Sequence, residues 1–419
     1  MPAVHQPRGH SIAGNETVKG SQTNTLLLRN VRAVLPQRII ESANVLIQHG
    51  LIQRILDSSI SDIPPADSIL DLQGLTLFPG FIDIHIHGAA GVDTMTANAD
   101  ALGRVSEFLA SQGVTAWLPT FVPAPQSQYE SAVDAIEQLM NEQAESGKHL
   151  RGARVLGVHY EGPFVNTAQC GALRPDYFRS FRSLSDIDDL PVPKNNAVRM
   201  MTLAPEIEGG VDLIRELRNR GWIISIGHTR ADLNVLDLAF EMGARHMTHF
   251  MNAMPPLHHR SPGPVGWGMS HDDVTCDIIA DGIHLDPAML KLLLKIKSSD
   301  RLSLISDSIA AAGQGDGEYS IWGETIVVKN GRTQNARGSI AGSVITMLDA
   351  ARMMKSLGAP EIEVALMTST NPSRLLGIGN QCGSIEEGKR ADLVVLDEVG
   401  NMRLAMVGGQ TMFDALNAT

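Results

Sequence analysis

Residues 78–88 read Phe78-Pro79-Gly80-Phe81-Ile82-Asp83-Ile84-His85-Ile86-His87-Gly88, a Pro-Gly breaker followed by an alternating run that ends in two histidines. The alternation predicts a β-strand, in which residues two apart project from the same face. His85 and His87 are therefore expected to point together beyond the strand end. This geometry suits a pair of metal ligands, but two histidines with ordinary hydrogen-bond partners in a buried strand explain this segment alone equally well.

The composition indicates a packed globular protein. The chain has 419 residues, of which 43% are apolar, enough for one large domain and one small domain. No apolar run approaches the ~18 residues that a membrane helix needs. The formal net charge of −12 argues against general binding to nucleic acid or to anionic membranes. Three widely separated cysteines favour neither a disulfide framework nor a thiolate metal cluster, so we expect a reducing cytoplasm.

The two ends of the chain have the same strand-like texture. Residues 1–24 are polar with scattered Gly and Pro, which predicts a disordered lead and not a signal peptide. Short apolar segments broken by Gly and Pro follow over residues 26–72, and the same pattern returns over residues 392–409. Because neither end has enough strands to bury a core alone, we expect residues 25–78 and 380–419 to pair into one small β-sandwich.

Strand-like and helix-like segments alternate over residues 79–379, the pattern of parallel βα units. Eight apolar strand candidates follow one another: Phe81–His87, Val114–Thr120, Val155–Tyr160, Val198–Leu203, Trp222–His228, His246–Phe250, Thr275–Ile283 and Leu302–Ser306. Eight such units favour a closed (β/α)8 TIM barrel, and an open doubly wound sheet is the alternative.

Ligand-type side chains recur where these strands end. They are His85, His87, Glu161, His228, His249 and Asp307. Barrel enzymes build their sites at the carboxyl ends of the strands, so we expect all six to meet at one mouth. Any one of them alone is best explained as a buried polar residue with a backbone partner, but together they would bury costly polarity unless a cation paired them.

Imidazoles with carboxylates suit a divalent ion such as Zn, Fe(II), Co or Mn. If Glu161 bridges two ions, one would lie with His85, His87 and Asp307 and the other with His228 and His249. A single ion fits the same residues equally well.

Ordered motifs over nearly everything after the lead resemble those of the N-acetylhexosamine-6-phosphate deacetylases of the amidohydrolase superfamily. The matching segments are PGFIDIHIHG, AGVDTM, GVHYEGPF, SIGHTRA, THFMNAMPPLHHRSPG, IIADGIHLD, LISDSIAAAG, DGEY, GSIAGS, STNPSRLLGI and GSIEEGKRADLVVLD. Each motif alone is weak, whereas the ordered set is specific. The resemblance implies metal-dependent hydrolysis of the N-acetyl group of N-acetylglucosamine 6-phosphate to glucosamine 6-phosphate and acetate, in amino-sugar catabolism.

The resemblance also implies roles for particular residues. The metal ligands that it gives directly are Glu161, His228 and His249. The His-x-His pair varies within the family, so its presence here keeps a second ion open. Many other amidohydrolases bridge two metals with a carbamylated lysine at the end of the fourth strand. Residues 198–205 contain no lysine, so Glu161 would take the bridging role.

Asp307 is the expected general base. A divalent ion acidifies water and polarises the acetamide carbonyl. One positioned carboxylate is then able to accept the water proton and to return a proton to the departing amine. The alternative for Asp307 is a carboxylate that only binds metal or only supports the fold.

A phosphorylated substrate needs a local anion site in this acidic chain. The expected substrate contacts are Asn252, Ala253, Arg260, His284, Gly162 and Ile340. Among them, Arg260 is suited to grip two phosphate oxygens at once. In relatives this arginine reaches the neighbouring subunit's site, which implies a homodimer. Ile340 begins a loop matched to the acetyl end of the site, although a plain turn explains its spacing equally well.

One departure from the family pattern affects the substrate. Where the family usually reads Gly-Ala-His, this chain has Gly171-Ala172-Leu173, which removes a donor that commonly contacts the sugar. The LHHR segment at 257–260 is shared with the galactosamine-type enzymes. The alternatives are therefore a deacetylase for the galacto epimer or for another N-acyl amino sugar, and a catalytically silent amidohydrolase scaffold. The full set of costly buried ligands argues against a silent scaffold.

Overall fold

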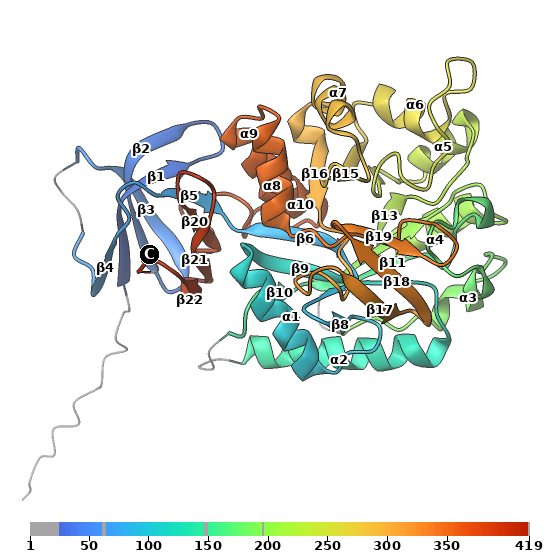
Figure 1. Ribbon diagram of the computed structural model, residues 1–419, viewed down its shortest axis with the longest axis horizontal. Coiled ribbons are helices and arrows are strands. Elements are labelled where there is room, and N and C mark those ends of the chain that lie inside the picture. The colour runs from blue at the N-terminus through green and yellow to red at the C-terminus, as the bar shows by residue number, and fades with distance from the viewer. Residues whose placement is uncertain (1–24, 61–63, 146–149, 195–196, 418–419) are drawn as a thin grey trace, which may run out of the picture.

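The computed structural model describes residues 25–60, 64–145, 150–194 and 197–417. A strand-rich unit made from both chain ends lies beside a parallel barrel, and β5 and β6 run from one into the other (Figure 1). The expected disordered lead, residues 1–24, falls outside the described residues. None of the described helices is both long enough and apolar enough for a membrane crossing.

The two chain ends form one eight-stranded sheet. Its strands are β1 (Thr25–Val34), β2 (Ile39–Gln48), β3 (Leu51–Asp57), β4 (Ser68–Asp71), β5 (Thr76–Pro79), β20 (Leu393–Leu396), β21 (Met402–Val407) and β22 (Gln410–Asp414). The ends join where β5 pairs antiparallel with β20, with Leu77 opposite Val395. Both side chains belong to a separate hydrophobic cluster that also contains Leu28 and Ile52. The prediction that the two ends pair is confirmed.

A second sheet of nine strands forms the barrel. Its strands are β6 (Phe81–Ile86), β9 (Val114–Phe121), β10 (Arg154–Val155), β11 (Gly157–Glu161), β12 (Val198–Leu203), β13 (Ile223–Ile226), β14 (His246–Met247), β15 (Thr275–Ile279) and β16 (Leu302–Ile305). Neighbouring strands pair in parallel. The chain after β16 returns to β6, where the backbone N–H of Asp307 donates to the carbonyl of His85 at 2.9 Å. The barrel is therefore nearly closed, and the open doubly wound alternative is wrong.

Helices cover the barrel (Figure 1). They are α1 (Ala99–Ser111), α2 (Gln126–Ala144), α3 (Ser185–Asp188), α4 (Gly210–Asn219), α5 (Leu233–Glu241), α6 (Gly263–Ser270), α7 (Pro287–Lys297), α8 (Met347–Ser356), α9 (Glu361–Ala365) and α10 (Asn371–Leu375). In α1, for example, Leu102, Val105 and Leu109 recur at helical spacing and are buried. The side chain of Asn98 caps its first turn by accepting from the backbone N–H of Ala101 at 2.9 Å.

A three-stranded antiparallel sheet follows β16 and was not expected from the sequence. Its strands are β17 (Gly317–Ile321), β18 (Glu324–Lys329) and β19 (Arg332–Asn335). Ile321, Ile326 and Val328 bury one face of it against residues 309–311. Since residues 309–311 directly follow the last barrel strand, this small sheet sits at the carboxyl rim of the barrel, where the predicted site lies.

The burial pattern of the barrel predicts a contrast between two leucines. Leu304 on β16 is fully buried, whereas Leu292 on α7 is 40% exposed. We expect Leu304→Ala to lower the free energy of unfolding by about 2–5 kcal/mol, because it leaves a cavity in a packed core. Leu292→Ala, the matched control, should stay within about 0.5 kcal/mol of the parent chain. Chemical denaturation measures both, and equal losses would contradict the assignment of the core.

Candidate metal and active site

The six predicted metal ligands meet at the carboxyl end of the barrel. They form two groups in which the ligand atoms lie within 4.8 Å of one another: His85, His87 and Asp307, and Glu161, His228 and His249. The most exposed of them, Asp307, is only 7% exposed. Residues that are up to 222 positions apart in the chain (85 to 307) are thus brought to one rim by parallel strands, as the sequence predicted.

Glu161, the last residue of β11, lies between the two groups. Its Oε1 is 2.8 Å from Nε2 of His228 and 3.0 Å from Nε2 of His249. Its Oε2 is 3.3 Å from Nε2 of His87, and its Oε1 is 3.7 Å from Nε2 of His85. One carboxylate therefore contacts four imidazoles, which is the position that a bridging ligand needs.

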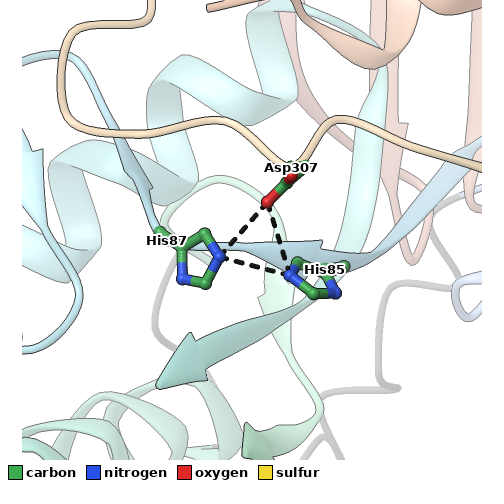
Figure 2. Close-up of side chains that lie close together, drawn as sticks. All are labelled: His85, His87 and Asp307. Atoms are coloured by element: carbon green, nitrogen blue, oxygen red, sulfur yellow. Dashed lines mark hydrogen bonds and ion pairs between the residues drawn. The ribbon is translucent and has the colours of Figure 1, made fainter. Parts of the chain in front are cut away.

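The other group is built from β6 and the segment after β16 (Figure 2). The Nε2 atoms of His85 and His87 are 3.2 Å apart. Oδ1 of Asp307 lies 3.4 Å from the first and 3.2 Å from the second. Figure 2 shows the rings of His85 and His87 on one side and the Asp307 carboxylate, carried by a loop, facing them. The strand alternation that predicted a shared face for the two histidines is confirmed.

Three of these residues have left-handed backbone conformations. The φ angles are +48° at His228, +29° at His249 and +48° at Asp307. Such values are uncommon for residues other than glycine and persist only where surrounding contacts enforce them. Ser343 donates its backbone N–H to the carbonyl of Asp307 at 2.7 Å, and Asp277 accepts the backbone N–H of His249. Each strand end is thereby turned so that its side chain reaches over the barrel mouth.

The orientation of the imidazoles fits a cation. Nδ1 of His228 contacts the carbonyl of Gln169 at 2.7 Å, and Nδ1 of His87 contacts the carbonyl of Thr120 at 3.3 Å. A carbonyl only accepts, so each Nδ1 carries the proton, and Nε2 of a neutral ring presents a lone pair to Glu161. Lone pairs and carboxylate oxygens that face one another at these distances repel unless a proton or a metal ion lies between them.

Protons compete with a metal ion for this cluster. Burial disfavours the charged form of His87, but hydrogen bonds with Asp307 and Glu161 outweigh burial and raise its pKa to about 10. His249 is likewise buried, and its hydrogen bond with Glu161 raises its pKa to about 9. Burial alone would raise the pKa of Glu161, but the surrounding imidazoles hold it well below its usual range. The carboxylates thus attract positive charge strongly.

Two buried residues beneath the ligands were given no role by the sequence. His159 lies edge-on to His85, with ring centroids 4.8 Å apart, and its Nε2 is 2.8 Å from Oγ1 of Thr202. Burial lowers the pKa of His159 to about 4, so it stays neutral. Asp277, fully buried on β15, contacts Nε2 of His246 at 2.9 Å in addition to the backbone of His249. A polar residue in the apolar run of residues 275–279 was the signal that would have identified Asp277.

A cavity of about 320 Å³ opens beside the ligands. Four of the predicted substrate contacts line it: Asn252, Ala253, His284 and Ile340. Nδ1 of His284 contacts Oδ2 of Asp281 at 2.6 Å, which fixes the ring. Nδ2 of Asn252 is buried and has no acceptor among the described residues. These groups provide hydrogen-bond donors away from the metal ligands.

Two predicted substrate contacts do not line this cavity in a single chain. Gly162 turns the backbone after Glu161 with φ +83°, and a side chain there would meet Pro123 and Val165 instead of the cavity. Arg260 is exposed on the loop before α6. Neither residue lines the cavity of the single chain, so their contacts with substrate stay predictions.

Comparison with known proteins agrees with this geometry. The amidohydrolase family model matches residues 76–416. N-acetylglucosamine-6-phosphate deacetylase of Bacillus subtilis is 36% identical over 399 residues, covering 93% of this chain and 97% of that protein. N-acetylgalactosamine-6-phosphate deacetylase of Escherichia coli O157:H7 is 35% identical over 376 residues, covering 89% of this chain and 97% of the relative.

Solved structures show the same architecture. N-acetylglucosamine-6-phosphate deacetylase from Pasteurella multocida superposes with a TM-score of 0.84 at 28% identity, covering 92% of this chain and 99% of the other. A variant of the Mycobacterium smegmatis enzyme in complex with N-acetyl-D-glucosamine-6-phosphate gives a TM-score of 0.81 at 28% identity, covering 94% and 100%. The chain therefore belongs to the amidohydrolase family, within its group of N-acetylhexosamine-6-phosphate deacetylases.

Proposed function

We propose that this chain hydrolyses the N-acetyl group of N-acetylglucosamine 6-phosphate, releasing glucosamine 6-phosphate and acetate. The observation that carries the proposal is the pair of histidine-carboxylate groups that share Glu161 at the mouth of the cavity. Relatives at 31–36% identity over most of the chain bear the name of this activity. Acetate release from the purified, metal-loaded protein tests it directly.

The residues at the mouth fit one or two divalent ions. His228, His249 and Glu161 would hold one ion, and His85, His87 and Asp307 would hold a second, with Glu161 between them. A divalent ion in these groups supplies a Lewis acid that acidifies water and polarises an amide carbonyl. Their imidazole and carboxylate donors suit Zn, Fe(II), Co or Mn, so metal analysis is needed to identify the ion.

Asp307 is the proposed general base. It lines the cavity, and the hydrogen bonds of its backbone to His85 and Ser343 fix its position at the rim. It would accept a proton from the attacking water and deliver a proton to the amine as the carbon-nitrogen bond breaks. The left-handed backbone of Asp307, with φ +48°, aims the carboxylate at both the ligand cluster and the cavity.

The other end of the cavity would bind the phosphate. The unpartnered Nδ2 of Asn252, the backbone of Ala253 and the imidazole of His284 are donors that line it. None of these carries a fixed positive charge, whereas a phosphate at neutral pH carries more than one negative charge. We propose that Arg260 of a second copy supplies this charge, which makes the working unit a homodimer.

The galacto epimer is a second candidate substrate. The Escherichia coli relative named for N-acetylgalactosamine 6-phosphate is 35% identical, nearly the same as the relative named for the gluco epimer at 36%. Leu173 lines the cavity where the family usually has histidine. Parallel kcat/KM measurements with both sugar phosphates decide between the two.

The three cysteines, Cys170, Cys276 and Cys382, are free thiols in the structure. Because widely spaced, unpaired cysteines are usual where thiols stay reduced, we propose a cytoplasmic location.

Removal of the proposed base should abolish turnover without emptying the site. We expect Asp307→Asn to lower kcat by about 10²–10⁴-fold, the usual contribution of general acid-base catalysis. The ion that Glu161, His228 and His249 would hold should remain, because this change leaves all three residues intact. Acetate release and elemental analysis measure the two effects.

Asp286→Asn is the matched control for this variant. Asp286 caps α7 by accepting from the backbone N–H of Ala288, and Asn caps helices as well as Asp. This control should retain full turnover. If Asp307→Asn also retains turnover, Asp307 is not the base.

Metal binding should release protons at neutral pH. The pKa values of about 10 at His87 and about 9 at His249 mean that both rings are protonated at pH 7.5 in metal-free protein. A metal ion binds only the neutral ring, so affinity should rise with pH up to these values and fall in acid. We expect about two protons per subunit on full loading, measured by calorimetry in buffers of different ionisation enthalpy. Equal heats in all buffers would show that neither ring is charged beforehand.

Arg260 should act across a subunit interface. Neither Arg260→Ala nor Asp307→Asn alone should turn over sugar phosphate efficiently. When the two variants are co-expressed, a mixed dimer has one site with both native residues, so about a quarter of the sites should recover. A mixture with no recovery, although mixed dimers form, would place Arg260 outside the partner's site.

A further inference from the structure

Trp322 occupies an unusual position at the tip of the small sheet. It lies in the two-residue turn between β17 and β18, where Ile321 pairs with Glu324. The φ angles are +53° at Trp322 and +77° at Gly323, as a type I′ turn requires. Such turns favour Asn, Asp or Gly at the first central position, and a bulky aromatic residue there is strained. A strained residue is retained where surrounding contacts and function require it.

The indole of Trp322 faces the proposed site. It lines the cavity and packs edge-on against His87, with ring centroids 5.1 Å apart and an interplanar angle of 81°. Its Nε1 is buried and has no acceptor among the described residues. A buried donor without an acceptor is unfavourable, so a ligand that accepts this hydrogen bond would bind more tightly.

Two arginines tie the small sheet to residues 171–174. Arg174, on the loop after Glu161, donates to the carbonyl of Trp322 at 3.1 Å. Arg337, which follows β19, donates from the side of the small sheet to the carbonyl of Ala172 at 2.9 Å. The small sheet and residues 171–174 are therefore tied together, and both contribute walls to the same cavity.

Leu173 on that loop is 3% exposed and lines the cavity with an apolar side chain. It stands where a histidine donor was expected from the resemblance, so the loop itself offers the sugar no side-chain donor at this position. The indole N–H of Trp322 is an unpaired donor on the adjoining wall of the same cavity.

We propose that Trp322 is a sugar-recognition residue of this site. Its ring provides a wall against which the C–H face of a hexosamine ring packs, and its N–H donates to a ring hydroxyl that Leu173 is unable to contact. Aromatic side chains combine a large apolar face with a polar edge, which suits a pyranose. The inference rests on the proposed function, since it assumes an amino-sugar phosphate in the cavity.

Two substitutions separate the parts of this proposal. Trp322→Phe keeps a ring and removes the N–H, so we expect KM for the sugar phosphate to rise about 3- to 10-fold with little change in kcat. Trp322→Asn removes the ring as well, so KM should rise about 10- to 100-fold. Because Asn is favoured in this turn, Tm of the Asn variant should not fall. A purely structural role predicts the reverse, a lower Tm and unchanged KM.

Deoxy analogues of the substrate identify the hydrogen bond. For the analogue that lacks the contacted hydroxyl, Trp322→Phe should not raise KM any further. For the other analogues, the substitution should raise KM as much as it does for the intact substrate. If Trp322→Phe raises KM by the same factor for every analogue, the indole N–H contacts no ring hydroxyl.

Ligand binding without turnover keeps this test separate from the proposed activity. The other tryptophans, Trp117, Trp222 and Trp267, are buried and do not line the cavity. Glucosamine 6-phosphate should therefore change the emission of the metal-free parent protein and of Trp222→Phe, but not that of Trp322→Phe. An emission change that persists in Trp322→Phe, with KM unaltered in both variants, overturns the proposal. A parent protein that binds the sugar phosphate but releases no acetate overturns only the proposed function.

Discussion

One buried carboxylate that contacts four imidazoles is the constraint on which this structure depends. Oxygen atoms of Glu161 lie 2.8–3.7 Å from Nε2 atoms supplied by three different strand ends. Charge removed from water in this way is unfavourable unless the partners are held in place. The parallel barrel meets this requirement, because it brings the carboxyl ends of its strands to one rim and leaves them solvent-shielded.

The residues beneath and around the rim serve that arrangement. His159, Thr202 and Asp277 form hydrogen bonds inside the barrel, where an aliphatic filling would be expected. They hold the backbone and rings of the ligands from below. The small sheet formed by β17–β19 lies over the same end and adds Trp322 to the cavity wall. The carboxyl end of the barrel therefore carries the ligands and the cavity, as barrel enzymes usually do, and the opposite end serves stability.

Much of the fold and of the ligand set was predictable from the sequence, because periodic apolar residues and local motifs indicate them. The alternating run before His85 and His87 gave both the first strand and its two ligands, and the eight apolar segments gave the barrel. The β17–β19 sheet was missed although Asn330-Gly331 is a typical hairpin turn, because each of its strands buries only one or two residues. Gly162 follows Glu161 in sequence but does not line the cavity of this chain, so its contact with substrate stays a prediction. The contacts of Trp322 depend on tertiary neighbours that no spacing rule encodes.

The left-handed backbone of the ligand residues has a consequence for how this chain tolerates change. At His228 and His249 the backbone favours glycine or asparagine over histidine, with φ of +48° and +29°. A laboratory selection for heat resistance alone would therefore be expected to discard these histidines early, since their replacement relaxes the main chain. At this rim, the residues that would give the greatest thermal stability differ from the residues that hydrolysis needs.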